Sequence, residues 1–286
     1  MILSFNIEYR TNWGEEVKLA GLSTESTPMY TTDGIYWTAE VELEVPQEGL
    51  TIHYSYQIEQ NGIVIRKEWN NFPRCLFLSG TPRKKYRIND CWKNIPEQLY
   101  LYSSAFTEAL LSHPERVDIP QGYKKGLIIK AYAPRINKDY CLAICGNQKA
   151  LGNWDPEKAV LMSDSNFPEW QVELDASKLK YPLEYKFILC HKQERKIDCW
   201  EKNPNRYLAD PEIKTNETLV ISDRYVYFDI PMWKGAGIAI PVFSLKSEKS
   251  FGVGDFGDLK LMIDWAVNTH QKVIQILPIN DTTMTH

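Results

Sequence analysis

The segment ICGNQKALGNWDPEKAVLM (residues 144–162) leads into PEW (168–170), LEYKF (183–187) and DCWEKNPNRYL (198–208). In LEYKF the apolar side chains alternate with Glu184 and Lys186, and this alternation is the period of a strand with one buried face. Glycine, asparagine and proline separate the short runs, as turns between neighbouring strands require. The stretch therefore predicts one antiparallel β-sandwich, which we expect to span residues 123–231.

The first ninety residues carry a similar pattern. Apolar side chains recur at every second position from Trp37 to Val45 and again from Ile52 to Ile58, and Asn61-Gly62 before the next run is a strong hairpin signal. Fragments of this half match the second: EVKLAG with CLAICG, IHYSYQI with LEYKFIL, and IRKEWNNFPR with IDCWEKNPNR. We therefore expect a repeat of the sandwich over residues 1–91.

Residues 92–122 interrupt the strand pattern. The fragment PEQLYLYSSAFTEALL (96–111) is rich in good helix formers and contains no turn signal. We expect a linker that contains a short helix.

The pattern changes again over residues 232–286. GAGIAIPVFSL and KVIQILPI are nearly continuously apolar, like strands buried on both faces. Between them, Leu259, Met262, Ile263, Ala266 and Val267 follow the period of a core-facing helix. Asp255 or Asp258 would cap this helix. Strand, helix and strand predict the opening unit of a parallel α/β fold, and because these residues are too few to complete one, we expect a longer protein.

Composition narrows the range of functions. The chain has 286 residues, of which 43% are hydrophobic and 24% charged, as in ordinary globular proteins. Its net charge of −4 offers no basic surface, so we expect neither nucleic acid nor membrane as a partner. The N-terminal residues show no secretory signal, and the six cysteines show no metal-binding spacing. We expect free thiols, a cytoplasmic location, and no metal or organic cofactor.

Four side chains of the second sandwich form the candidate site: Trp154, Lys186, Trp200 and Asn205. Trp154 lies in a Gly-Asn-Trp-Asp turn, where a purely structural tryptophan would be awkward. Indole rings stack on the C–H faces of pyranose sugars, while lysine and asparagine reach the hydroxyls at the edges. A lone exposed lysine is ordinarily a solvated surface residue, but the tryptophans beside it favour a polysaccharide site.

These motifs closely resemble carbohydrate-binding module family 20, the starch-binding domains, over residues 124–230. In that family the tryptophan of LGNW, the lysine of EYKF, and the tryptophan and asparagine of WExxxNR form the main glucan site, and they correspond to the four side chains above. The resemblance implies an immunoglobulin-like sandwich that binds starch, glycogen and maltooligosaccharides. The family's second site uses loop tyrosines. This chain has Asn137, Lys138 and Phe167 there, so Phe167 is a secondary candidate contact.

The first sandwich resembles a degenerate copy of the same module. It lacks LGNW, Ser55 occupies the lysine position, and Lys67 stands in place of the second tryptophan. Trp69, two residues further on, is another candidate sugar contact, although packing in the core or at an interface is its more ordinary role. Trp37, within a strand, is expected in the core.

The C-terminal motifs SFGVGDFGDL and LPIND resemble the start of glycoside hydrolase family 77, the 4-α-glucanotransferases. The resemblance implies that residues 232–286 begin a (β/α)8 barrel and that the complete protein transfers α-1,4-glucan segments by a retaining mechanism. Asn280 and Asp281 follow the carboxyl end of a strand, where barrel enzymes place substrate contacts, although Asp281 would equally suit a cap. Nothing here matches the family's catalytic carboxylates, so we assign no catalytic residue and expect these residues to bind glucan without transferring it.

Two other functions fit a mainly β chain of this kind. One is a non-catalytic starch-binding protein, in which the α/β end is a remnant. The other is a sandwich protein whose aromatic side chains bind protein partners. Retention in an amylopectin gel that depends on Trp154 and Trp200 would exclude the second of these.

Overall fold

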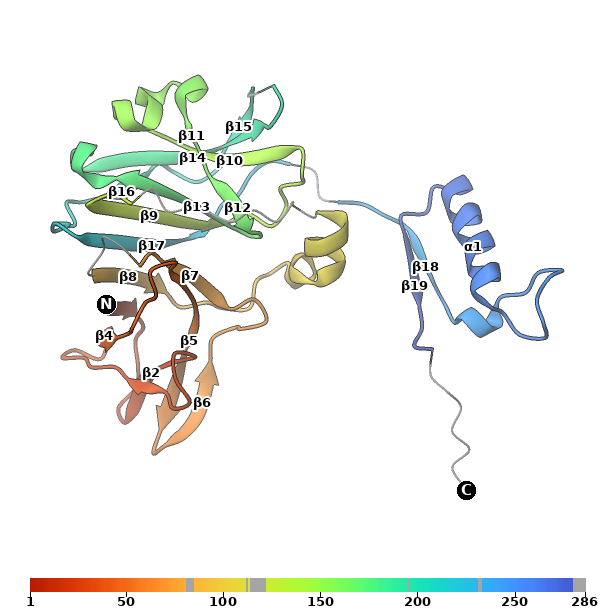
Figure 1. Ribbon diagram of the computed structural model, residues 1–286, viewed down its shortest axis with the longest axis horizontal. Helices are drawn as coiled ribbons and strands as arrows, with labels where there is room; N and C mark the ends of the chain where they lie inside the picture. Colours follow the sequence, from red (N-terminus) through yellow and green to blue (C-terminus); the bar gives the residue numbers. More distant parts are fainter. Residues whose placement is uncertain (81–84, 112, 114–121, 195, 231–232, 280–286) are drawn as a thin grey trace. The chain divides into compact units, whose positions relative to one another are not determined.

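The computed structural model describes residues 1–80, 85–111, 113, 122–194, 196–230 and 233–279 (Figure 1). The chain forms two compact units, Met1–Ile230 and Pro231–His286. The first unit holds both β-sandwiches, and the second holds a strand, a helix and a strand. The prediction of a mainly β chain with sandwich sheets is confirmed.

The first sandwich consists of two layers. One layer is antiparallel, in the order β3-β2-β5-β6 with β7 beside β5, and the other contains β4, β1 and β8. Its core includes Phe5, Tyr56 and Tyr86, together with Trp37, which is in the core as its position in an alternating strand predicts. The strands are β1 (Ile2–Glu8), β2 (Glu15–Ala20), β3 (Thr27–Pro28), β4 (Tyr36–Glu42), β5 (Leu50–Gln60), β6 (Ile63–Lys67), β7 (Arg74–Leu78) and β8 (Lys85–Cys91).

The predicted hairpin at Asn61-Gly62 is present between β5 and β6. Gln60 pairs with Ile63, and the two turn residues have φ values of 52° and 76°. Two consecutive left-handed residues match the twist of the flanking strands, which is why asparagine and glycine are favoured there.

The predicted short helix in the linker is also present, in an irregular form. It comprises a 3₁₀ turn, η1 (Leu99–Tyr102), and a π-helical turn, η2 (Ala105–Leu110). Tyr102 packs edge-on against Trp69, with 4.8 Å between ring centroids, so the linker rests on the first sandwich.

The second sandwich repeats the architecture. Its antiparallel layer, here called the β14 sheet, has the order β11-β10-β14-β15 with β16 beside β14. Trp170 is fully buried in the core, with Phe187 and Leu183. Its elements are β9 (Lys125–Tyr132), β10 (Tyr140–Gly146), η3 (Lys149–Trp154), η4 (Pro156–Lys158), β11 (Val160–Leu161), β12 (Ser163–Asn166), β13 (Glu169–Asp175), η5 (Ala176–Lys178), β14 (Leu183–His191), β15 (Ile197–Trp200), β16 (Arg206–Leu208) and β17 (Glu217–Tyr225).

The remaining layers of the two sandwiches join into one shared sheet, in the order β12-β13-β9-β17-β8-β1-β4 (Figure 1). The central strands β9, β17, β8 and β1 are parallel to one another, unlike the antiparallel layers on either side. Leu127 and Leu219 point into the core of the second sandwich, whereas Ile128 and Val220 belong to the core of the first. Strands β9 and β17 are therefore buried on both faces, which explains why LIIKAYA is apolar at every position except Lys130.

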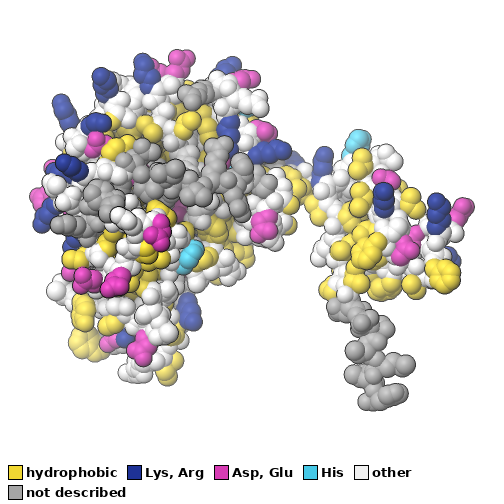
Figure 2. Space-filling model, viewed as in Figure 1, with side chains coloured by type: hydrophobic (Ala, Val, Ile, Leu, Met, Phe, Trp, Pro, Cys, Tyr) yellow, Lys and Arg dark blue, Asp and Glu magenta, His cyan; other side chains and the backbone are white. Residues whose placement is uncertain are grey.

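The second unit contains β18 (Gly237–Ile240), η6 (Val242–Ser244), α1 (Phe256–Asn268) and β19 (Val273–Ile276), with β18 parallel to β19. Both predicted caps contribute, because Asp255 and Asp258 form a reciprocal capping box at the start of α1. The predicted core-facing side chains are only partly covered, and Ile263 and Val267 are 48% and 66% exposed. Figure 2 shows hydrophobic side chains gathered on this unit. A single helix on two strands encloses too little volume to bury them.

Candidate functional site

Strand β14 directs its side chains to two different environments. Tyr185 and Phe187 point into the core, while Glu184 and Lys186 lie on the outer face of the β14 sheet. Ile188 pairs with Trp200 across the β14–β15 ladder. Because paired residues and their neighbours two positions away share a face, Trp200 and Lys186 lie on the same outer face.

Trp154 reaches this face from a strained turn. Gly152, Asn153 and Trp154 have φ values of 82°, 52° and 61°, and the last is unusual for a bulky residue. A Cβ at position 152 would lie 2.9 Å from the carbonyl oxygen of Lys158, so glycine is required there. The turn brings the Trp154 ring to 6.2 Å from that of Trp200, inclined at 49°. Left-handed residues cost roughly 1–2 kcal/mol each, and such strain is concentrated at functional sites.

The polar members of the predicted set complete this face. The exposed Asn205 donates from Nδ2 to Oε1 of Glu184 at 2.7 Å, so its amide is held beside the outer edge of β14. In the described part of the chain, the Lys186 ammonium has no acidic side chain within ion-pair distance, and it remains available to a ligand. The structure therefore brings Trp154, Lys186, Trp200 and Asn205 together on one face, which we name the glucan face after the role predicted for it from the sequence.

Two neighbours of these side chains, Cys145 and Asp155, have shifted pKa values. Cys145 pairs with Lys186 across the β10–β14 ladder and is fully buried, and burial raises the pKa of its thiol. Asp155 follows Trp154 and accepts hydrogen bonds from Lys158 and from the amide of Glu157, which lower the pKa of its carboxyl. These contacts hold the tryptophan turn in place.

A buried ion pair supports the loop from Trp200 to Asn205. Glu201 is 2% exposed and accepts from the amide of Phe187 at 2.9 Å. Arg206 donates to both of its carboxylate oxygens, at 3.2 and 2.9 Å, and lies over the Phe187 ring. Sequence reasoning did not single out this pair. The signal was there, because the motif WExxxNR places a carboxylate and a guanidinium next to the two sugar candidates.

The same arrangement of a carboxylate and an arginine, which we call the clamp, occurs in the first sandwich. Glu68 accepts from the amide of Tyr56 at 3.1 Å, and Arg74 donates to both of its oxygens, at 3.2 and 2.6 Å. Arg74 lies over the Tyr56 ring as Arg206 lies over its own aromatic neighbour. Lys67 precedes Glu68 as Trp200 precedes Glu201, so Lys67 occupies the position of Trp200 in the first sandwich. The sequence repeat is thus a structural repeat that has kept its scaffold.

A further aromatic side chain lies on the glucan face. Tyr207 pairs with Glu184 across the β14–β16 ladder and is 67% exposed. We did not single it out from the sequence. The available signal was its position directly after Arg206, because adjacent residues of a strand point to opposite faces.

The secondary candidates fall elsewhere. Trp69 is 8% exposed and packs against Tyr102 and the Lys93 ammonium, the packing role that the sequence also allowed, and a sugar contact at Trp69 stays a prediction. Phe167 is half-buried, and the His113 ring stacks on it at 4.2 Å, which leaves at most one face for a ligand. Asn280 and Asp281 lie outside the described residues.

Within the described ranges, no cluster of three or more histidine, cysteine or acidic side chains is arranged to hold a metal ion. The same residues contain no helix with the length and apolar character needed to span a membrane. All six cysteines have free thiols. On the β10–β14 ladder Cys190 lies opposite Cys141, and on the β14–β15 ladder Cys199 lies opposite Leu189.

Comparison with known families agrees with this geometry. Residues 129–220 match the starch binding domain family. The starch binding domain match contains all four side chains of the glucan face. Residues 240–286 match the 4-alpha-glucanotransferase family, so both resemblances noted in the sequence are confirmed.

Individual relatives show the same two similarities. The chain is 27% identical to a 4-alpha-glucanotransferase of Oryza sativa subsp. japonica, over 99% of this chain and 32% of that protein. A second relative is a 4-alpha-glucanotransferase of Chlamydia trachomatis, which is 50% identical over 46 residues. These residues are 16% of this chain and 9% of that protein. Among solved structures, the family 20 carbohydrate-binding module of a maltotetraose-forming amylase from Pseudomonas saccharophila matches 34% of this chain and 99% of its own, with 18% identity and a TM-score of 0.28. The chain spans about a third of the length of the rice relative.

Proposed function

We propose that this chain binds α-1,4-glucans, such as starch, glycogen and maltooligosaccharides, on the glucan face. One observation supports this most directly. Within the starch binding domain match, the half-buried rings of Trp154 and Trp200 stand 6.2 Å apart on one outer face, with Lys186 and Asn205 beside them. The turn also holds the bulky Trp154 at a φ of 61°, and backbone strain of this kind is concentrated at functional sites.

The geometry suits a curved sugar chain. Two rings inclined at 49° offer stacking surfaces to successive glucose units of a bent strand, which a flat pair would not. Burying roughly 100 Å² of apolar surface on each ring contributes about 2–3 kcal/mol. Binding through one such site lies in the millimolar to micromolar range. The Lys186 ammonium and the Asn205 amide supply donors for the hydroxyls at the sugar edges.

We further propose that the chain serves as the glucan-binding part of a 4-alpha-glucanotransferase. The match of residues 240–286 and the rice relative support this assignment. In a retaining mechanism a carboxylate attacks the anomeric carbon while a carboxylic acid protonates the leaving oxygen. Capture of the glucosyl intermediate by the 4-hydroxyl of a second glucan, in place of water, transfers the segment. The six free thiols support a reducing compartment such as the cytoplasm.

Affinity electrophoresis in native gels that contain amylopectin tests the binding proposal. The protein should be retarded, and Trp154→Ala or Trp200→Ala should each weaken retention by about 30- to 150-fold in apparent Kd, as a loss of 2–3 kcal/mol implies. Trp13→Ala is the matched control, because Trp13 is 99% exposed and belongs to the first sandwich.

Unaltered retardation of the Trp154→Ala/Trp200→Ala double variant would refute the proposed site. No retardation of the unmodified protein would favour a role of these aromatics in binding protein partners.

A further inference from the structure

A cleft separate from the glucan face opens at one edge of the shared sheet. Strands β9, β17, β8 and β1 run parallel and adjacent, so their carboxyl ends meet at the same edge. The chain leaves these ends through Tyr132, Tyr225, Trp92 and Tyr9, and all four line a cleft of about 880 Å³. This volume lies within the range of ligand sites, which are often found between domains. Both sandwiches contribute to the cleft, and neither forms it alone.

The walls of the cleft are aromatic. On the side of the first sandwich, the rings of Tyr9 and Trp92 lie 4.3 Å apart. On the side of the second sandwich, Tyr132 and Tyr225 lie 5.8 Å apart. Tyr36 and Tyr227 stand at the rim and are 59% and 51% exposed. Facing aromatic walls with hydroxyls at their edges suit a ligand that has both C–H faces and hydroxyl groups.

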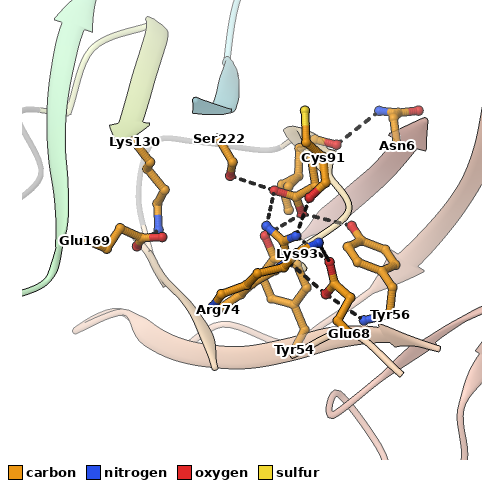
Figure 3. Close-up of polar contacts among 12 residues, drawn as sticks. Asn6, Tyr54, Tyr56, Glu68, Arg74, Cys91, Lys93, Lys130, Glu169 and Ser222 are labelled. Carbon is orange, nitrogen blue, oxygen red and sulfur yellow. Dashed lines mark hydrogen bonds and ion pairs between the residues drawn. The ribbon is translucent and has the colours of Figure 1, made fainter. Parts of the chain in front are cut away.

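The floor of the cleft is a buried polar network whose charges balance (Figure 3). Arg74 pairs with Glu68 at 2.6 Å and with Asp90 at 3.1 Å. The ammonium of Lys93, a second cation, lies over the rings of Trp69, Phe72 and Tyr132 at 5.1–5.4 Å. Lys130 and Glu169 add a third buried pair at 2.8 Å, so three cations accompany three carboxylates in this network.

The acceptors in this floor are already occupied. Asp90 also accepts from the hydroxyls of Tyr54, Tyr56 and Ser222, at 2.9, 2.9 and 2.6 Å. A floor with balanced charges and satisfied acceptors does not attract a free ion. It favours a neutral polar ligand that stacks on the walls and bonds to groups near the rim.

Polar groups near the rim can meet such a ligand. Asn203 lines the cleft, and Asn205, two residues later, belongs to the glucan face. The loop that carries both asparagines is tied to the cleft, because the Asn203 side-chain amide donates to the carbonyl of Tyr225 at 3.5 Å and the backbone amide of Lys202 donates to the carbonyl of Tyr227 at 2.7 Å.

We propose that this cleft is a second carbohydrate site, formed jointly by the two sandwiches, which takes a short neutral α-glucan segment. The choice of α-glucan rests on the proposed function of the glucan face, whereas the neutral, stacking character of the ligand follows from the cleft. The first sandwich thus contributes to sugar binding through its strand ends although its own outer face lacks the site residues.

A site-resolved NMR titration of the whole chain with maltoheptaose tests this. Backbone amides of Trp92–Asn94 report on the cleft, and those of Gly152–Asp155 report on the glucan face. Both groups should shift and saturate. Tyr36→Ala/Tyr227→Ala should abolish the cleft shifts and leave the others, while Trp154→Ala/Trp200→Ala should do the reverse. Tyr30→Ala, which removes a tyrosine that is 71% exposed and outside the cleft, is the matched control.

The outcomes separate the two proposals. Unmoved amides at Trp92–Asn94 in the unmodified protein, with shifts at Gly152–Asp155, would overturn the cleft and leave the glucan face intact. The opposite pattern would overturn the glucan face alone. Cleft shifts that persist in Tyr36→Ala/Tyr227→Ala would also overturn the proposal, because the sugar would then not contact the tyrosines at the rim of the cleft.

Discussion

Replacing Arg74 with methionine tests how strongly the first unit depends on the buried charges between its sandwiches. The Arg74 side chain is 5% exposed, and its partners Glu68 and Asp90 are 1% and 0% exposed. Methionine fills much of the volume but leaves the buried carboxylates of Glu68 and Asp90 without their cation. Removing one partner of a buried pair costs about 3–5 kcal/mol. We expect a loss of this size in the free energy of unfolding, a large fraction of the roughly 5–15 kcal/mol of a typical protein.

Arg206→Met is the matched control, because Arg206 forms the same clamp in the second sandwich. It strands only Glu201, and its own side chain is 16% exposed, so water can reach the site. The loss should be roughly half as large, about 2 kcal/mol. Urea unfolding of the whole chain at pH 7, followed by circular dichroism, measures both values.

A triple variant distinguishes the cost of unpaired buried charges from the cost of altered packing. Arg74→Met combined with Glu68→Gln and Asp90→Asn removes the stranded charges and should recover more than half of the lost stability. If Arg74→Met loses less than about 1 kcal/mol, or no more than Arg206→Met, the assignment of a charge-balanced floor is refuted.

Three further changes probe other parts of the first unit. Gly152→Ala adds a Cβ 2.9 Å from the Lys158 carbonyl at a φ of +82°, so it should cost about 1–2 kcal/mol and weaken amylopectin retention; Gly62→Ala, with φ +76° and no neighbour within 4 Å, should be milder and leave retention unchanged. Equal effects of the two changes would contradict the contact argument. Burial lowers the pKa of Lys93 from 10.5 to about 8, so the unfolded chain holds more protons between these values and stability rises with pH there. Relative to Lys93→Met, the free energy of unfolding should gain about 1 kcal/mol between pH 7 and pH 9, and parallel pH profiles would contradict this. Trp69→Ala should lower the free energy of unfolding by about 3–5 kcal/mol in urea titrations, because the ring is packed; weaker amylopectin retention at unchanged stability would instead support Trp69 as a sugar contact.

The sequence predicted the elements whose signals are local. Alternation in LEYKF, the turn residues Asn61-Gly62 and the helical period after Asp255 each depend on nearby residues, and each element is present. The four side chains of the glucan face were also identified from the sequence, because the motifs that carry them resemble a known module. Their shared face follows from strand parity and one tight turn.

What could not be predicted depends on contacts distant in sequence. The pairing of β17 with β8 joins segments more than a hundred residues apart, and alternation along one strand does not reveal which edge it will join. The cleft and its charged floor follow from that pairing. Burial of Trp69 likewise depends on Tyr102 in the linker, whose position no local pattern indicates.

The pairing between β8 and β17 also determines what would happen to each sandwich if the two were separated. If either sandwich were cut out at the linker, a long strand edge would be left with bare amide and carbonyl groups, a template for aggregation. The second half would in addition expose Ile128 and Val220. The edge strands of the first sandwich are therefore constrained by their pairing with the second, whether or not its own outer surface binds anything.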